Sequence, residues 1–241
     1  MSASAKVRRT SDDEGPGTTK DQGRPRTKDG PRTKDQGQRT NLAKLLAATT
    51  NRGKLAEIAI LLEGVGFDLV TLAEWPEVSP PEETGSTFAE NARDKALYYA
   101  ARSGQLTVAE DSGLEIDALG GAPGVASARF GGVDMSYPDK FALIYDALRR
   151  TGAGGSPARF VCALALAARD TILFEARGTI EGRIAPEPRG DGGFGYDPIF
   201  FYPPLGRTLA ELSAEKSTIS HRAGAFRALR AFLVRPDTGY A

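Results

Sequence analysis

A cluster of hydrogen-bond donors lies in segment 190–222 of this chain. It contains the single histidine, His221, which directly precedes Arg222 and follows Lys216 by five residues. Lysine and arginine carry positive charge and donate hydrogen bonds, and an imidazole ring can donate or accept one. Because a helix dipole favours anions at its start, a basic helix start is unusual for purely structural purposes. The composition of the cluster suits an anionic, heteroaromatic ligand such as a nucleotide.

The stretch 192–198 precedes these donors and has the sequence Gly-Gly-Phe-Gly-Tyr-Asp-Pro. Glycines allow the backbone to approach a ligand closely. Phe194 and Tyr196 provide rings that can stack on a base, and the proline after Asp197 favours an extended backbone at that residue. A glycine-rich turn whose aromatic rings pack into the core is the structural alternative.

Two adjacent acids, Glu110 and Asp111, follow the apolar residues 106–109. We expect 106–109 to be a buried strand with the acids at its carboxyl end, where open α/β sheets bind their ligands. Neighbouring residues of an extended chain point to opposite sides, so only one acid is expected to face the site. We choose Asp111, which adjoins Ser112 and the flexible Gly113.

A second pair of acids, Glu82 and Glu83, lies on a proline-rich loop ahead of a helix expected over 88–103. Thr87 and Glu90 have the spacing of a capping box, which gives Glu90 a structural task. Glu82 and Glu83 have no such task. They are candidate metal ligands, although a solvated loop explains them equally well.

The segment 49–54, Thr-Thr-Asn-Arg-Gly-Lys, lies between a predicted strand over 42–48 and a predicted helix. The free N–H groups of a helix start, together with a lysine, can hold a phosphate. The segment is not a Walker A motif, because its lysine is followed by leucine. Helix capping by Thr50 or Asn51 is the structural alternative.

The elements that must position these residues follow from apolar periodicity. Single strands and helices alternate first, and an antiparallel pair of strands with Arg169-Asp170 as its turn comes later. This order predicts an α/β fold with a mixed central β-sheet flanked by helices. Cys162, in an apolar run, is expected to be a buried strand residue rather than a nucleophile. The predicted strands are 42–48, 66–72, 106–109, 159–168 and 171–184, and the predicted helices are 54–62, 88–103, 139–150 and one that starts at 220–222.

Residues 1–41 differ in composition from the rest of the chain. They carry ten Lys/Arg against six Asp/Glu, a net +4, which leaves 21 against 25 in the remaining 200 residues, a net −4. Only four of the 41 are apolar, and a Thr-Lys-Asp repeat recurs three times. Such a tail cannot offset its ordering entropy and is predicted to be disordered. The folded domain is expected over 42–241, and a weak polyanion-binding arm is the alternative role for the tail.

The sequence has no apolar run near the roughly 20 residues of a membrane span, and no signal peptide is visible. Hydrophobic residues make up 40% of the chain, and its one cysteine cannot form an internal disulfide. We therefore expect a globular protein of the reducing cytoplasm with no membrane partner.

Five ordered motifs of this chain resemble those of the inosine/xanthosine triphosphate pyrophosphatases, a family also described as dITP/XTP pyrophosphatases. The resemblance covers about residues 42–234 and gives the tail no counterpart. Glu110 departs from the family pattern, in which many members have aspartate, but the acid matched to the catalytic one is Asp111. The motifs are Thr49–Lys54, Glu82–Ala92, Glu110–Leu114, Gly192–Phe200 and Glu215–Arg222.

The resemblance implies a fold with an active-site cleft between two lobes and a homodimer. It implies Mg²⁺-dependent hydrolysis of a nucleoside triphosphate between the α- and β-phosphates, which gives a monophosphate and pyrophosphate. Asp111 would be the proton acceptor and a metal ligand, and Glu82 the second metal carboxylate. Lys54 would hold phosphate, and Phe194 would stack on the base. The substrate-binding residues implied are Thr49, Thr50, Asn51, Arg52, Gly53, Lys54, Ser112, Phe194, Gly195, Tyr196, Asp197, Lys216, His221 and Arg222.

Base selection follows from the six-position of the purine. Hypoxanthine and xanthine carry a carbonyl where adenine carries an amino group, so donors such as His221 and Arg222 would discriminate against adenine by about 10⁴-fold. Guanine shares the carbonyl, and the sequence does not identify what rejects it. Two alternatives stay open. One is a Maf-type pyrophosphatase acting on modified nucleotides, against which the run 220–222 argues, and the other is a non-enzymatic nucleotide- or nucleic-acid-binding protein, although no specific nucleic acid is expected.

Overall fold

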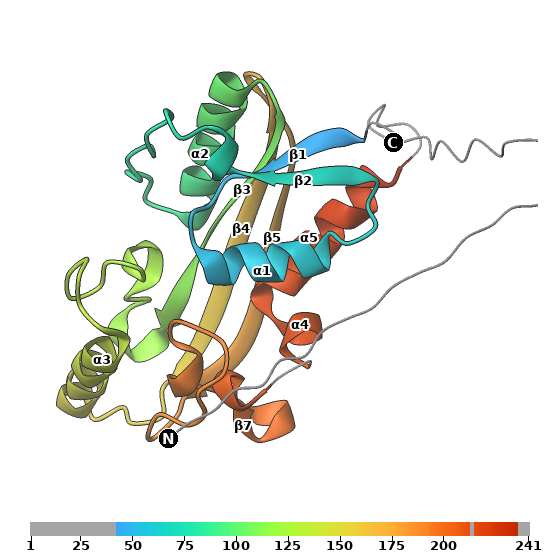
Figure 1. Cartoon of the computed structure of the whole chain (residues 1–241). Helices are drawn as coiled ribbons and strands as arrows, with labels where there is room; N and C mark the ends of the chain where they lie inside the picture. Colours follow the sequence, from blue (N-terminus) through green and yellow to red (C-terminus); the bar gives the residue numbers. More distant parts are fainter. Residues whose placement is uncertain (1–41, 213–214, 236–241) are drawn as a thin grey trace, which may run out of the picture. The chain divides into compact units, whose positions relative to one another are not determined.

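The computed structural model describes residues 42–212 and 215–235, so the prediction of a disordered tail over 1–41 lies outside the described residues. Strands and helices alternate in the first part of the described range, and a long hairpin follows (Figure 1). The strands are β1 (Ala43–Ala47), β2 (Phe67–Thr71), β3 (Leu106–Ile116), β4 (Pro157–Ala168), β5 (Thr171–Ile184), β6 (Phe200–Tyr202) and β7 (Arg207–Thr208). The α-helices are α1 (Arg52–Leu61), α2 (Phe88–Ser103), α3 (Tyr137–Thr151), α4 (Lys216–Ile219) and α5 (His221–Leu233).

The described strands form one seven-stranded sheet with the order β2-β1-β3-β4-β5-β6-β7. β1 runs parallel to both β2 and β3, whereas every later neighbour in the sheet is antiparallel. The prediction of a mixed α/β fold is therefore confirmed. The hairpin turn also lies at Arg169-Asp170, as predicted, because β4 ends at Ala168 and β5 begins at Thr171. In the described part of the chain, no helix is long and apolar enough to cross a membrane.

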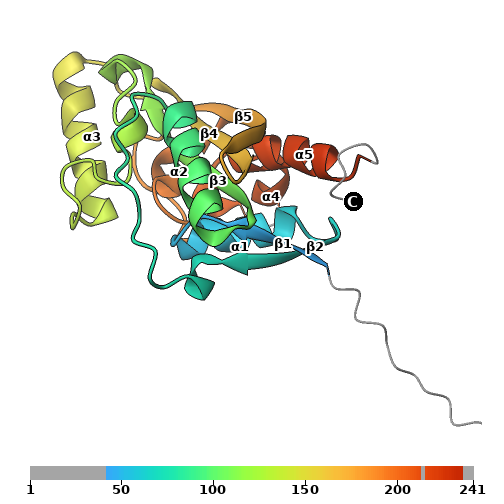
Figure 2. The ribbon, with the colours of Figure 1, turned by 90° about the horizontal axis from the view of Figure 1, so that it is seen from above.

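Helices cover both faces of the sheet, and the alternation of β4 decides which residues meet which helix. Cys162, Leu164 and Leu166 pack in one buried cluster with residues of α1 and α5. The intervening Ala163, Ala165 and Ala167 pack in another with the alanines of α2. Figures 1 and 2 show α2 and α5 on opposite sides of the central strands. This is the two-residue period expected of a strand that is buried on both faces.

β3 is longer than the sequence predicted, which corrects the expected place of the two acids. It continues from Leu106 to Ile116, so Glu110 and Asp111 lie in the middle of a strand rather than at its carboxyl end. The reason is its partner: β4 pairs with β3 along its length as far as Ile116. β1, on the other side, pairs only as far as Val108. Beyond Val108 the β1 side of β3 is therefore without a strand partner, apart from a single bridge between Glu115 and Pro123.

The carboxyl end of β3 packs against α3. Leu114 and Ile116 of β3 share a buried cluster with Phe141, Ile144 and Leu148, which recur along one face of α3. Ser136 caps this helix by accepting a hydrogen bond from the Asp139 N–H. The segment between β3 and α3 is held beside β3 by the Leu114 N–H, which donates to the Ser127 hydroxyl at 2.9 Å, and by the bridge between Glu115 and Pro123.

Candidate active site

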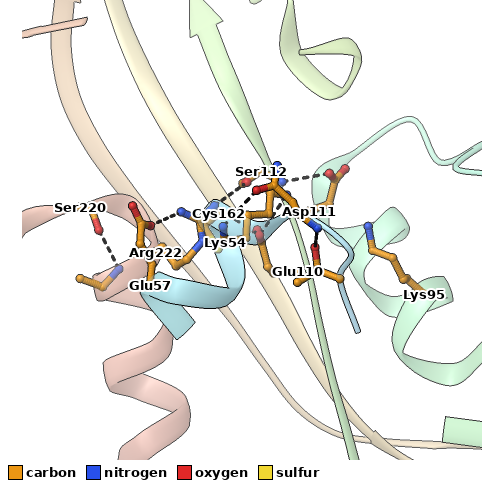
Figure 3. Close-up of polar contacts among 12 residues, drawn as sticks. Lys54, Glu57, Lys95, Glu110, Asp111, Ser112, Cys162, Ser220 and Arg222 are labelled. Atoms are coloured by element: carbon orange, nitrogen blue, oxygen red, sulfur yellow. Dashed lines mark hydrogen bonds and ion pairs between the residues drawn. The ribbon is translucent and has the colours of Figure 1, made fainter. Parts of the chain in front are cut away.

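A cavity of about 290 Å³ lies where β1 ends and β3 continues. Its walls come from the loop after β1, Asp111 of β3, the acidic loop with α2, the glycine-rich stretch before β6, and the first residues of α4 and α5. These segments are far apart in the sequence, and Figure 3 shows polar contacts that join α1, β3 and α5. Lys216 of α4 joins the glycine-rich stretch through Asp197. The predicted site residues that line the cavity are Thr49, Thr50, Asn51, Lys54, Asp111, Ser112, Phe194, Gly195, Tyr196, Asp197, Lys216, His221 and Arg222.

The first wall is the start of α1, which β1 delivers to the cavity. Asn51 caps the helix: its side-chain oxygen accepts a hydrogen bond from the Lys54 N–H at 3.1 Å. The capping alternative is therefore correct for Asn51. The cap uses only the backbone N–H of Lys54, whose side chain lines the cavity. The Lys54 ammonium lies 2.9 Å from the carboxylate of Glu110. A positive charge thus stands at a helix start, as an anion site requires.

Glu110 and Asp111 point to opposite sides of β3, as the alternation of a strand predicts. Glu110 is only 2% exposed and pairs with Lys54 and, at 3.3 Å, with Arg222. Although burial acts to raise the pKa of Glu110, the positive charges of Arg222 and Lys54 hold it well below its usual value. The Cys162 thiol lies 3.4 Å from the same carboxylate and is buried, as predicted. Glu110 is therefore a buried, permanently charged anchor.

Asp111 faces the cavity and has a different electrostatic environment. Burial raises the pKa of its carboxyl, and this effect outweighs the opposing charge of Lys95 and the hydrogen bond from Asn91. The Asn91 amide donates to Asp111 Oδ2 at 3.0 Å. A carboxylate whose proton affinity is raised is better suited to accept a proton from water than an ordinary aspartate.

The acidic loop before α2 brings Glu83 to the cavity. The carboxylate of Glu83 forms an ion pair with Lys95 and lies 3.8 Å from Arg129. Although burial disfavours the charged form of Lys95, the Glu83 carboxylate raises the pKa of this lysine. Glu83 and Lys95 line the cavity, whereas Glu82 does not. The carboxylate that faces Asp111 across the cavity is thus that of Glu83.

The glycine-rich stretch is held in shape by Asp197. Its carboxylate accepts hydrogen bonds from the Phe194 N–H at 2.8 Å and from the Lys216 ammonium at 2.7 Å. Burial raises the pKa of Asp197 despite this ammonium. The ring of Phe194 lies with the Lys216 ammonium 4.8 Å and the Arg222 guanidinium 5.7 Å from its centre. An aromatic ring and positive charges therefore share one wall.

Phe194 and Tyr196 have different environments, which corrects the expectation that both rings are available for stacking. Phe194 is partly exposed at the cavity, and a side chain at Gly53 would place its Cβ 2.7 Å from this ring. Tyr196 is buried; its hydroxyl donates to the Ser127 carbonyl at 2.8 Å, and its ring packs edge-on against Tyr137. The structural alternative, a ring packed into the core, applies to Tyr196 alone.

His221 begins α5 and lies on the floor of the cavity. Its ring stacks on Phe160 with centres 4.9 Å apart and is 5% exposed. Burial and the neighbouring charge of Arg222 hold the pKa of His221 well below its usual value, so the imidazole is neutral at pH 7. The helix comes this close because β5 has Gly178 there: a Cβ at Gly178 would lie 2.1 Å from the His221 carbonyl oxygen.

Arg222 is the centre of a buried ion-pair network rather than a free donor. Its guanidinium contacts Glu57, Glu110 and the Ser112 hydroxyl, the last at 3.0 Å. Glu57 also accepts a hydrogen bond from Lys216 at 2.8 Å. In the described part of the chain, Arg222 Nε and His221 Nδ1 are buried nitrogens without a hydrogen-bond partner. The network ties α1, β3, α4 and α5 together beneath the cavity.

Three predicted site residues do not line the cavity, and several residues that sequence reasoning passed over do. Arg52 and Glu82 are exposed, and Gly53 supports Phe194 from behind. Sequence reasoning also missed Glu57, which belongs to the ion-pair network beneath the cavity. Its position three residues after Lys54, on the same helix face, was a signal that could have identified it. Glu83, a candidate metal ligand from the sequence, lines the cavity. The additional residues with polar or aromatic side chains there are Lys95, Tyr99, Ser127, Tyr137 and Phe160.

The carboxylates at the cavity suit a hard divalent cation, although no group of three or more His, Cys, Asp or Glu residues in the described ranges is arranged to hold a metal ion. Magnesium is typically held by one or two carboxylates together with water and substrate phosphates. Glu83 and Asp111 supply such a pair of carboxylates, and Lys54 and Lys95 lie beside them. The residues present therefore fit a magnesium ion that enters with a phosphorylated ligand.

The fold and the cavity define the class of mixed α/β proteins in which carboxylates, lysines and an aromatic ring line one cavity beside the central sheet. The model of the Ham1 family matches residues 45–232, and the chain belongs to this family. The chain is 47% identical over 191 residues to the dITP/XTP pyrophosphatase of Exiguobacterium sibiricum, which covers 79% of this chain and 96% of that protein.

Solved structures agree with this assignment. A HAM1 protein from Coxiella burnetii matches with a TM-score of 0.74 at 39% identity, over 80% of this chain and 98% of that one. The nucleoside-triphosphatase / dITP/XTP pyrophosphatase from Mycobacterium abscessus matches with a TM-score of 0.63 at 40% identity, over 78% of this chain and 97% of that one. The resemblance noted from the five motifs is confirmed at the level of family and fold.

Proposed function

We propose that this protein hydrolyses non-standard purine nucleoside triphosphates, namely dITP, XTP and ITP, to the monophosphate and pyrophosphate, with Mg²⁺. The observation that carries the proposal is one cavity in which carboxylates and lysines face an aromatic ring and a neutral histidine. The first group suits a triphosphate with its metal, and the second suits a purine base. Relatives 43–50% identical to this chain carry the name dITP/XTP pyrophosphatase.

The cations of the cavity neutralise the polyphosphate. A triphosphate carries about four negative charges, and more negative charge develops on the pyrophosphate as it leaves. Lys54 and Lys95 are positioned for this task, because both line the cavity and both act by their charge on the carboxyl of Asp111. The start of α1 adds the N–H groups of its first turn.

Asp111 is the proposed proton acceptor for the attacking water. Its raised pKa makes it a stronger base than an ordinary aspartate, and the Asn91 amide orients it. When bound, Mg²⁺ supplies Lewis-acid stabilisation of the phosphate charge. Asp111 and one carboxylate of the acidic loop, for which Glu83 is better placed than Glu82, would hold it.

His221 is proposed to select the base rather than to move protons. With its pKa held well below neutrality it is a weak base, but its neutral ring can donate one hydrogen bond. A buried donor satisfied by a six-carbonyl faces another donor when adenine is bound, which is the arrangement that gives strong discrimination. Phe194 is proposed to stack on the same base.

A substrate panel tests the proposal. Purified full-length protein is incubated with Mg²⁺ and ITP, dITP, XTP, GTP, ATP or a modified pyrimidine triphosphate, and pyrophosphate and orthophosphate are measured separately. We expect pyrophosphate from the first three and far lower rates from ATP. Orthophosphate as the product, or equal rates on ATP and ITP, would contradict the proposal. A preference for the pyrimidine would favour the Maf-type alternative.

We also propose that the enzyme is a cytoplasmic homodimer. The family resemblance supports the homodimer, and the single cysteine supports the reducing cytoplasm. Light scattering on the purified full-length chain tests the homodimer, since a dimer has twice the 25.6 kDa mass of the chain. Fractionation of the producing cells tests the cytoplasmic localisation.

A further inference from the structure

Asn91 makes two hydrogen bonds that join the acidic loop to the proposed catalytic carboxylate. Its Oδ1 accepts from the Gly85 N–H at 2.8 Å, and its Nδ2 donates to Asp111 Oδ2 at 3.0 Å. The amide has only this orientation available, because a backbone N–H can only donate and an ionised carboxylate can only accept. The side chain is 2% exposed, and Asn91 does not line the cavity.

The loop is held along three consecutive residues. Glu90 accepts hydrogen bonds from the N–H groups of Ser86 and Thr87, and Asn91 takes that of Gly85. The approach at Gly85 is so close that a Cβ there would lie 2.5 Å from Asn91 Oδ1. The backbone two residues after Glu83 is therefore fixed against α2.

The same face of α2 reaches the acidic loop again one turn later. Lys95 follows Asn91 by four residues, so the two side chains lie one above the other. Asn91 contacts Asp111, and Lys95 contacts Glu83. The two carboxylates proposed to face the substrate phosphates are thus held at a set separation by adjacent turns of one helix.

We propose that Asn91 is a positioning residue that fixes Asp111 relative to the acidic loop. The inference rests on the proposed function, in which Asp111 accepts a proton from the attacking water. The Ser112 N–H donates to Asp111 Oδ1 at 2.9 Å, and the Asn91 amide donates to Oδ2 at 3.0 Å, so each carboxylate oxygen is held by one donor. Of these two donors, only Asn91 also contacts the acidic loop, through the Gly85 N–H. Misplacement of a reacting group by about 1 Å can lower a rate by about 100-fold, so such a restraint has a measurable effect.

Two variants separate the two hydrogen bonds. Asn91→Asp keeps an acceptor for Gly85 but turns a second carboxylate toward Asp111, and Asn91→Ala removes both bonds. We expect kcat for ITP to fall at least about tenfold in both, with KM changed less than about threefold. We expect amide hydrogen exchange of the peptide over 82–88 to accelerate in Asn91→Ala only. Wild-type kcat in Asn91→Asp, or unchanged exchange in Asn91→Ala, would overturn the corresponding half of the proposal.

A double-mutant cycle provides a readout that needs no activity. In the wild-type background, Asn91→Asp places two carboxylates together, and we expect the unfolding temperature to fall by about 4 °C or more. In the Asp111→Asn background, the carboxylate introduced at position 91 can accept a hydrogen bond from the amide introduced at position 111, so the same change should cost little. An equal fall in both backgrounds would show that the side chains at positions 91 and 111 do not interact and would overturn the proposal.

Glu90→Gln is the matched control, because Glu90 holds the same loop but does not touch Asp111. Its effect on the unfolding temperature should be the same in both backgrounds. The thermal cycle also separates this inference from the proposed function. If the substrate panel showed no pyrophosphate release, the proposed function would fail while the cycle could still reveal the contact.

Discussion

Removal of the negative charge of Glu110 should destabilise the fold, because two cations depend on it. The change is Glu110→Gln, which keeps the size of the side chain. Breaking a buried ion pair by removing one partner typically costs about 3–5 kcal/mol. Lys54 is 17% exposed and can turn toward water, and Arg222, at 1%, keeps its contact with Glu57. We therefore expect the lower end of the range, about 3 kcal/mol, or about 6–12 °C in unfolding temperature.

The pH dependence of this loss has a definite sign. The folded-state pKa of Glu110 is lowered, so its contribution to stability is present above the unfolded pKa of about 4.5 and is lost as the pH falls. The difference between wild type and Glu110→Gln should therefore be largest near pH 7 and should narrow between about pH 5 and pH 3. Urea unfolding followed by circular dichroism, at a series of pH values, measures both quantities.

Glu181→Gln is the control for this experiment. Glu181 also pairs with an arginine, at 3.1 Å from Arg159, but its side chain is 65% exposed. Exposed pairs typically contribute less than about 1 kcal/mol, so this variant should unfold close to wild type. Two results would refute the reasoning about the buried network. One is an unfolding free energy of Glu110→Gln within about 1 kcal/mol of the wild-type value. The other is a difference in unfolding free energy between wild type and Glu110→Gln that does not change with pH.

Three further predictions concern the cavity and its supports. Asp111→Asn should lower turnover by about 100-fold or more in a pyrophosphate-release assay while the protein stays folded by circular dichroism; turnover within tenfold of wild type would exclude Asp111 as the proton acceptor. Gly53→Ala should raise KM for ITP several-fold, because its Cβ would lie 2.7 Å from the Phe194 ring and displace it. The unfolding temperature should not fall, because alanine favours the helix. An unchanged KM would mean that the ring does not contact the base. Gly178→Ala should lower the unfolding temperature by at least about 4 °C, since its Cβ would lie 2.1 Å from the His221 carbonyl oxygen and backbone cannot yield as a side chain can. A wild-type unfolding temperature would show that α5 can shift without cost.

Local sequence patterns predicted the strands, the helices and many of the residues that line the cavity. These features depend on the periodicity of apolar residues and on motifs within a short segment. The alternation of a strand predicted that only one of the two acids faces the cavity, and the neighbouring Ser112 and Gly113 led to Asp111, which lines it. The length of β3 was not predictable in the same way. Its last residues stay in the sheet because β4, about 50 residues later, pairs with them. Residues such as Gly113 and Glu115 do not by themselves indicate a strand.

Side-chain roles that depend on distant partners were also outside the reach of the sequence. Whether Glu82 or Glu83 faces the cavity is decided by Lys95, one of several lysines that could have been the partner. The burial of Tyr196 depends on a hydrogen bond to the Ser127 carbonyl, 69 residues away. A glycine-rich stretch with two aromatic residues gives no sign of which ring packs inward.

The alanines between β4 and α2 act as a spacer that sets the depth of the site. Ala163 and Ala165 of the strand share a buried cluster with Ala92 and Ala96 of the helix, so the helix lies as near to the sheet as methyl groups allow. Asn91, which holds Asp111, is adjacent to this seam. A larger residue at one of these positions would push α2 outward and carry Asn91 away from the sheet. Substitutions of these alanines, which touch neither substrate nor metal, are thus expected to change turnover. The small size of the residues between β4 and α2 is required by the distance between helix and sheet and not by the reaction itself.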